Sequence, residues 1–218
     1  MAAGKRYKWQ GSKVEVILDY SANSPSQAIT GISKANPAVV TATNTLANGD
    51  VVQINGVVGM TEVNGLTFVV SGVSGSSFKL TGIDSTGYTT YSSGGRFDEA
   101  AFSSFCELTN YNRQGGSSPE IEATTICSTA TEYEIGLPDF GTTALDFNYA
   151  PDTSVQAALA DFHLSGDVMG VRVTLPKTGG KRIQLGFVQQ QSETAGNGGI
   201  WKSSTTLRNT GQPVDIAA

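Results

Sequence analysis

Short runs of alternating apolar and polar residues, separated by turn-forming residues, recur along this 218-residue chain. Because successive side chains of a β-strand point to opposite faces, such alternation predicts strands with one buried face. Ala144–Tyr149 is the clearest run, with Asp146 on the face opposite Leu145 and Phe147. Further strands are predicted at Lys13–Tyr20, Phe105–Asn110, Ile121–Thr131, Val171–Leu175, Ile183–Phe187 and Ile200–Asn209.

One segment follows the period of a helix instead. Its apolar residues are spaced i, i+3, i+4 and i+7: Val155, Ala158, Leu159 and Phe162. This spacing gives one apolar stripe along a helix of about three turns. Asp152 or Ser154 is predicted to cap the N-terminus of the helix, and Gly166 is predicted to end it.

The pattern changes between residues 29 and 95, where short runs rich in Val, Ile and Thr are separated by Asn-Gly pairs. Asn-Gly favours a type I′ hairpin turn, because both central residues of that turn need a positive φ. Ser/Asn/Pro-rich and Ser/Gly-rich stretches flank this region. We therefore predict a small all-β module at 29–95, inserted into a host domain formed by 1–28 and 96–218. The pairs are Asn48-Gly49, Asn55-Gly56 and Asn64-Gly65.

The predicted host domain is mainly β: an antiparallel β-sandwich or open barrel with one short α-helix packed on it. The 26 glycines and the abundance of Thr, Ser and Val suit strands and tight turns. No apolar run approaches the roughly 20 residues that span a bilayer, so no membrane association is expected. The N-terminus lacks the apolar region of a secretory signal.

Charge is sorted along the chain. Residues 97–170 contain twelve acids and one base, Arg113, for a net charge of −11, whereas residues 171–218 carry +4 and the first 28 residues carry +2. Opposite charges on different parts of one subunit steer copies together and fix their register. An acidic surface also repels nucleic acid, whose phosphates need Lys and Arg. Charge alone leaves two readings open: a self-assembling protein, and a soluble acidic protein with uneven charge.

Candidate chemistry is sparse. His163 is the single histidine, on the polar side of the predicted helix, and no nucleophile motif accompanies it. None of the Gly-Gly pairs is followed by the Lys-Ser/Thr of a phosphate-binding loop. Cys106 and Cys127 are predicted to be buried, reduced thiols. We therefore predict no enzyme activity, and no catalytic, cofactor-binding or metal-binding residue.

The second half of the chain carries a distinctive succession of short segments. Leu137-Pro138-Asp139-Phe140-Gly141 precedes the strand at Ala144–Tyr149, and Gln156-Ala157-Ala158-Leu159 lies in the predicted helix. A strand ending in Pro176, a hairpin and Gly211-Gln212-Pro213 follow. This order resembles the tail tube (major tail) proteins of bacteriophages with long, non-contractile tails. The inserted module resembles a small all-β module of phage structural proteins, and a half-domain of ubiquitin-activating enzymes whose adenylation machinery is missing here.

The resemblance implies a structural virion protein that self-assembles into stacked, six-fold rings, which form the tail tube and guide the genome during ejection. DNA would pass through an acidic lumen without specific binding. The implied partners are further copies of this chain, a tape measure protein and a tail terminator. The implied location is the virion tail, after synthesis in the cytoplasm of the host bacterium. The predicted lumen-facing acids, which lie on or beside alternating strands, are Glu107, Glu132, Glu134 and Asp146.

A polar loop between the predicted strands is expected to contact a neighbouring subunit, because it is rich in Gly and Ser and has no apolar anchor. Its candidate residues are Arg113, Gln114, Gly115, Gly116, Ser117 and Ser118. The module at 29–95 is expected outside the tube, where it leaves the stacking surfaces free. An alternative function is a receptor-binding or glycan-binding accessory protein of a virion or cell surface that uses the inserted module.

Overall fold

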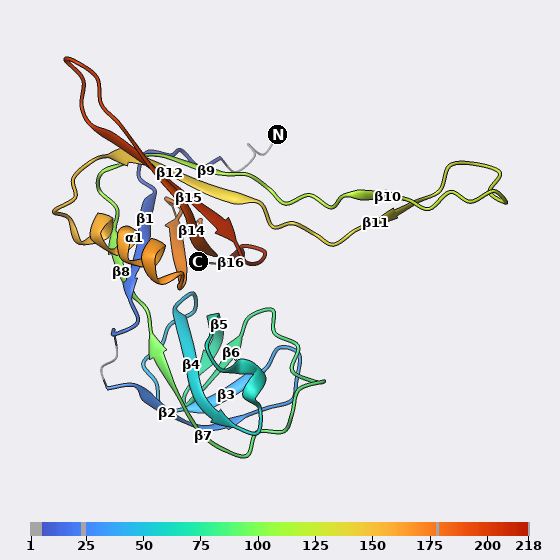
Figure 1. Cartoon of the computed structure of the whole chain (residues 1–218). Coiled ribbons are helices and arrows are strands. Elements are labelled where there is room, and N and C mark those ends of the chain that lie inside the picture. Colours follow the sequence, from blue (N-terminus) through green and yellow to red (C-terminus); the bar gives the residue numbers. More distant parts are fainter. Residues whose placement is uncertain (1–5, 23–24, 178, 218) are drawn as a thin grey trace, which may run out of the picture.

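Half of the described strands form one antiparallel sheet in the order β8-β1-β13-β14-β15-β12-β9, with β16 paired to β14 (Figure 1). The computed structural model describes residues 6–22, 25–177 and 179–217. We call this sheet, with its helix, the body. Its strands are β1 (Lys13–Asp19), β8 (Ala101–Ser104), β9 (Leu108–Arg113), β12 (Thr142–Asn148), β13 (Val168–Thr174), β14 (Lys181–Thr194), β15 (Lys202–Asn209) and β16 (Val214–Ile216).

The two halves of this sheet share one core. Val16 of β1 and Val171 of β13 belong to the same buried cluster as Leu145 of β12 and Leu207 of β15. Alternation in β12 is as predicted, because Leu145 and Phe147 are buried while Asp146 is half-exposed. The fold class is therefore as predicted: mainly β, antiparallel, with a single α-helix among the described residues.

The helix α1 (Ser154–Ser165) contacts β1 and β14 and buries the predicted apolar stripe. The predicted N-cap residues were wrong. Thr153 caps the helix: its backbone is extended, and its hydroxyl accepts the hydrogen bond from the Gln156 amide. Ser154 is already helical, so its side chain cannot take that role. Gly166 ends the helix in the left-handed conformation, as predicted.

A second hydrophobic cluster fills a closed six-stranded barrel, in the order β2-β3-β6-β5-β4-β7. Closure leaves no unpaired strand edge. The predicted module boundaries, residues 29 and 95, fall within β2 and β7. The elements are β2 (Gln27–Ile32), β3 (Val39–Ala42), β4 (Val51–Val58), η1 (Thr61–Val63), β5 (Leu66–Ser74), β6 (Ser77–Leu80) and β7 (Ser93–Glu99).

The Asn-Gly pairs of the barrel do not form type I′ turns, so that prediction was wrong. All three glycines have positive φ, but Lys177 is the one non-glycine residue with positive φ in the described part of the chain. Asn55-Gly56 lies inside β4. Asn64 instead uses its side chain, which accepts from the Val57 amide and donates to the Val57 carbonyl. Tertiary contacts thus replace the local turn geometry that Asn-Gly favours.

Several strand boundaries also differ from the predictions. The predicted strand at Ile121–Thr131 overlaps only the last two residues of β10 (Glu120–Glu122), and β9 begins at Leu108 rather than Phe105. β16 follows the strand that we expected to be the last. The predicted hairpin is present as β13 and β14, with Thr178 of its turn outside the described residues.

The barrel packs against the face of the sheet that carries Glu15 of β1 and Arg172 of β13. Val51 and Val69 of the barrel join the body's core cluster. Arg172 of β13 donates through Nη1 to Asp50 Oδ1 (3.3 Å) and through Nε to Glu15 Oε2 (2.9 Å). Apolar burial and a charged network therefore both hold the barrel to the body.

Candidate functional site

Residues 114–141 leave the sheet between β9 and β12 and project from the body as a long hairpin, which we call the arm (Figure 1). Its only regular pairing in the described residues is between β10 and β11 (Tyr133–Ile135), with Glu120 opposite Ile135 and Glu122 opposite Tyr133. Toward the body, Ser117 forms a bridge with Asp139. The arm therefore consists of two paired legs with no third layer to cover them.

The arm exposes large apolar side chains. Their exposed fractions run from 53% at Ile121 to 103% at Ile126 at its end. A two-stranded hairpin without a covering layer is marginally stable in water, and exposed apolar groups that lie together mark interaction surfaces. The arm is therefore the strongest candidate for a contact with another molecule. The exposed apolar residues are Ile121, Ile126, Tyr133, Ile135 and Leu137.

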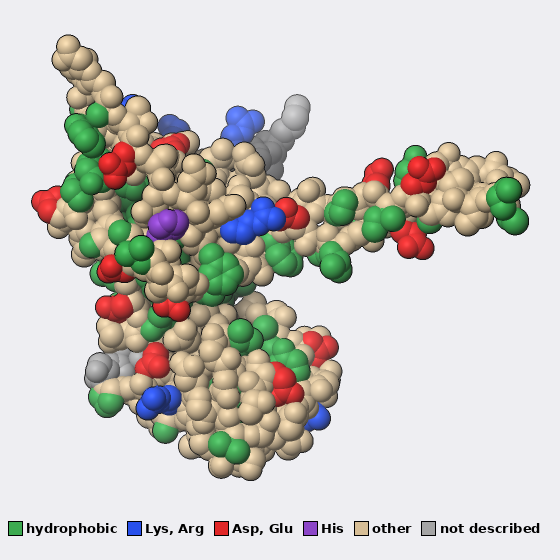
Figure 2. Space-filling view, in the orientation of Figure 1, with side chains coloured by type: hydrophobic (Ala, Val, Ile, Leu, Met, Phe, Trp, Pro, Cys, Tyr) green, Lys and Arg blue, Asp and Glu red, His purple; other side chains and the backbone are tan. Residues whose placement is uncertain are grey.

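The arm is also acidic. It contains five acids and no Lys, Arg or His. Figure 2 shows apolar and acidic side chains along it, with no Lys or Arg in this view. Asp139, near the body, accepts from the Gly141 amide and from Arg208 Nη2, and both bonds lower the pKa of its carboxyl. The other four acids lie farther out, with no ion pair to any described residue: Glu120, Glu122, Glu132 and Glu134.

The predicted inter-subunit loop, Arg113–Ser118, contributes the end of β9 and the start of the arm. Arg113 is half-buried and donates from Nε to Gln184 Oε1 (3.0 Å), so it holds the arm to the body. Gly116 lies so close to the Asp139 carbonyl that an added Cβ would meet it at 1.9 Å. This close approach requires glycine at the point where the two legs meet.

A polar face covers the outer side of β9, β12, β15 and the end of β14. By register, Asp146 lies beside Asn110 and Ser204, and Ser204 lies beside Ser192. Asp146 accepts hydrogen bonds from Ser204 Oγ (2.6 Å) and Asn110 Nδ2 (3.0 Å). These bonds, with the Ser204 bond first, lower the pKa of Asp146. Lys202 also lies on this face, opposite Asn148.

The four predicted lumen acids do not lie together. Glu132 and Glu134 belong to the arm, and Glu107 is half-buried just before β9. Asp146 is the member of the set that lies on the polar face. A one-residue offset in strand position changes which face a side chain meets, so the pattern alone did not separate these locations.

Both cysteines are exposed and unbonded, so the prediction of buried thiols was wrong. Phe105 is buried in the core, but Cys106 follows it in the turn between β8 and β9, where its side chain meets solvent. Cys127 lies at the end of the arm, within the Thr125–Ser128 turn. No apolar layer is available there to bury it.

Other candidate positions offer little chemistry. His163 is exposed on α1, with Nδ1 3.2 Å from the Val188 carbonyl oxygen. Within 6–22, 25–177 and 179–217, no three His, Cys, Asp or Glu side chains are grouped to hold a metal ion. None of the helices described in the structure is long and apolar enough to span a bilayer.

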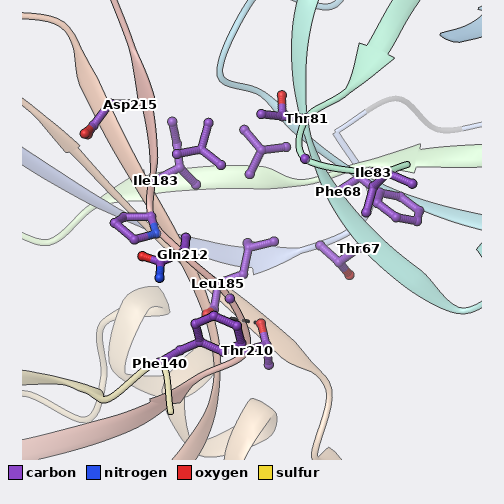
Figure 3. A pocket seen from close by; sticks show the side chains of 15 residues that line it. Thr67, Phe68, Thr81, Ile83, Phe140, Ile183, Leu185, Thr210, Gln212 and Asp215 are labelled. Carbon is purple, nitrogen blue, oxygen red and sulfur yellow. Dashed lines mark hydrogen bonds between the residues drawn. The ribbon is translucent and has the colours of Figure 1, made fainter. Parts of the chain in front are cut away.

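A groove of about 700 Å³ lies between the barrel and the body (Figure 3). Thr67 and Ile83 line it from the barrel, Ile183 and Leu185 line it from the body, and Phe140 lines it from the base of the arm. Its walls are mainly apolar, with no nucleophile and base held together.

The protein-family model described as the ubiquitin-activating enzyme E1 FCCH domain matches residues 35–100, which lie mostly in the barrel. Comparison with curated protein sequences gives no match. Among solved structures, the chain is similar to the SPP1 tail tube (TM-score 0.41, 13% identity, covering 53% of this chain and 69% of that chain). It is also similar to the tail of an empty GTA particle with C6 symmetry (TM-score 0.43, 12% identity, covering 53% and 87%). The family model covers less than half of the chain, and the structural likenesses are too distant to assign it to a family.

Proposed function

We propose that this chain is a structural subunit that self-assembles into the tail tube of a bacteriophage. The observation that carries the proposal is the arm, which projects apolar and acidic side chains away from the body. The sequence resemblance of the second half to tail tube proteins supports the same function. No catalytic role is proposed for any residue.

The charge distribution supports self-assembly over binding to an unrelated partner. The arm carries five acids and no base, so the rest of the chain is neutral overall at a total charge of −5. Within that remainder, residues 1–28 and 171–218 are basic. Arm and body are thus complementary between copies. A contact between unlike surfaces repeats head to tail and builds open or ring-closed assemblies.

We propose that the subunits form stacked six-fold rings with the polar face toward the lumen. Hydroxyl and amide side chains on this face give passing DNA few cations to bind. Asp146 is the proposed lumen acid with the strongest support, since its carboxylate lies on this face. Glu107 remains a proposed lumen acid, whereas for Glu132 and Glu134, which lie on the arm, we propose a contact with another copy instead.

We propose that the barrel lies on the outside of the tube. It packs on β1, β13 and β14, in the opposite half of the sheet from β9 and β12. Replacing Gln27–Glu99 with a short Gly/Ser linker should preserve assembly and reduce the outer diameter of the tubes in electron micrographs. A replaced variant that keeps a folded body but forms no rings would contradict this position for the barrel.

The proposed partners beyond further copies are a tape measure protein within the lumen and a terminator at the end of the tube. The proposed location is the virion tail, after synthesis in the bacterial cytoplasm. DNA would pass through the tube without specific binding.

Negative-stain electron microscopy of the concentrated, purified chain tests the proposed function. We expect hollow tubes of uniform diameter whose number increases with protein concentration. Because the proposed assembly surfaces belong to one chain, no other component should be needed. Particles that stay monomeric at every concentration, with or without a nucleating tail complex, would overturn the proposal.

A further inference from the structure

A second groove, of about 390 Å³, lies at the end of the body where the N-terminal segment crosses the sheet. Trp9 stacks on Tyr111 of β9, with ring centroids 6.4 Å apart and planes 15° from parallel. Tyr7 and Trp9 are about half-exposed, and Leu175 and Arg182 complete the walls. The groove therefore combines an aromatic wall with polar edges.

The surroundings of this groove are basic. Residues 6–13 contain Arg6, Lys8 and Lys13 and no acid, and of these Lys13 is paired with Glu15 (2.7 Å). Lys8 lines the groove and forms no ion pair with any residue in the described ranges. Arg182, on the other wall, is held by Asp215 through two bonds of 2.7 Å. An acidic and apolar ligand matches this combination of groups.

The arm of the same copy cannot supply that ligand. Tyr111 belongs to β9, the strand that continues into the first leg of the arm, and the arm projects away from β9 and the rest of the body (Figure 1). Each leg has about 12 residues, which at about 3.3 Å per residue gives a reach of roughly 40 Å. Any arm that occupies the groove therefore belongs to a second copy.

Resting on the proposed function, we propose that the arm of one copy binds this groove of a second copy. Ile126, fully exposed at the end of the arm, packs on Trp9 and Tyr111 of the second copy. The arm glutamates nearest that end, Glu122 and Glu132, face the basic N-terminal segment. Because each copy carries both the arm and the groove, the contact repeats along one direction and joins successive rings.

The native thiol at the end of the arm allows a direct test by cross-linking. In a Cys106→Ser background, Cys127 is combined with Ser12→Cys in the groove or with Ala160→Cys on the exposed side of α1, as a matched control. Assembled protein is treated with a short bis-maleimide. We expect a ladder of cross-linked oligomers for Ser12→Cys and no ladder for Ala160→Cys.

The outcomes separate the inference from the proposed function. Tubes that show no ladder with Ser12→Cys, or equal ladders with both variants, would overturn the groove contact while leaving tube formation intact. A chain that forms no assembly at all would overturn the contact together with the proposed function.

A double-mutant cycle measures the same contact without cross-linking. Ile126→Asp and Trp9→Ala should each raise the protein concentration needed for assembly by at least about tenfold, because each removes apolar burial. The double variant should show little further loss, since both changes remove one contact. Fully additive losses would show that Ile126 and Trp9 act at different interfaces, and would overturn the proposal.

Discussion

The barrel and the arm differ in how their strands are paired and covered. The barrel closes six strands around its own cluster, which includes the fully buried Phe78 and Phe97. The arm has two short strands and exposes nearly every apolar side chain that it carries. A closed barrel is stabilised by its own core, whereas an uncovered hairpin gains its stability from a contact outside the chain.

The sharpest test of this comparison removes the arm. Deleting Ser117–Asp139 joins Gly116 to Phe140 at a point where the two legs already touch. The deletion leaves the body core intact, so circular dichroism and thermal unfolding should match those of the wild-type monomer. Assembly measured by sedimentation should be lost. Normal tubes from the deletion variant would show that the arm is not an assembly element.

Arg172 should matter more to stability than any surface arginine. Its guanidinium is 12% exposed, bonds Glu15 and Asp50, and lies 3.9 Å from the centroid of the Phe102 ring. Arg172→Met should leave two nearly buried carboxylates without this partner and cost about 3 kcal/mol of unfolding free energy. Urea unfolding of the arm-deleted monomer measures the loss without a contribution from assembly.

Arg182→Met is the matched control for this prediction. Arg182 also holds a carboxylate, Asp215, but both side chains are about half-exposed. Its loss should cost at most about 1 kcal/mol. Equal losses for Arg172→Met and Arg182→Met would show that the barrel does not depend on the charged network.

The same network should make stability depend on pH. Burial alone would raise the pKa of Glu15, but hydrogen bonds from Arg172 and Lys13 outweigh it and hold the pKa below the ordinary value of 4.5. The stability that Glu15 contributes is therefore complete above pH 4.5 and is lost as the pH falls through the lower, folded-state pKa. Glu15→Gln should flatten this part of a melting-temperature profile. If the melting temperature of Glu15→Gln falls with decreasing pH as steeply as that of the wild type, other carboxyl groups cause the pH dependence.

The smallest expected effect concerns the polar face. Asp146 is half-exposed, and its hydrogen bonds to Ser204 and Asn110 contribute modestly to stability. Asp146→Lys should leave the monomer folded and make assembled tubes retain DNA at low salt, since six-fold repetition multiplies the added charge. Glu134→Lys on the arm is the comparison variant, and its tubes should hold less DNA in the lumen. If Asp146→Lys tubes retain no more DNA than wild-type tubes, Asp146 does not face the lumen.

Secondary structure was predicted correctly where apolar side chains repeat with a clear period. The stripe of α1 and the alternation of β12 were predicted correctly, because each buries one face against a continuous core. The arm was not predicted as a paired hairpin. Its strands are three residues long, and both of their faces are exposed, so they leave no periodic pattern to detect.

Contacts between distant parts of the chain were also beyond the sequence. Nothing in the spacing of Asp50 and Arg172 indicates that they meet, although this contact joins the barrel to the body. The groove formed by Trp9 and Tyr111 has the same origin, because its walls lie about a hundred residues apart in sequence. Only the paired strands bring such residues to one place.

A cryo-electron microscopy reconstruction of the assembled chain tests the central claim most directly. The account predicts a hollow tube in which the arm of every subunit is covered by another copy, with the polar face of β9, β12 and β15 toward the lumen and the barrel outside. A tube whose arms extend freely into solvent, with the subunits joined through other surfaces, would contradict it.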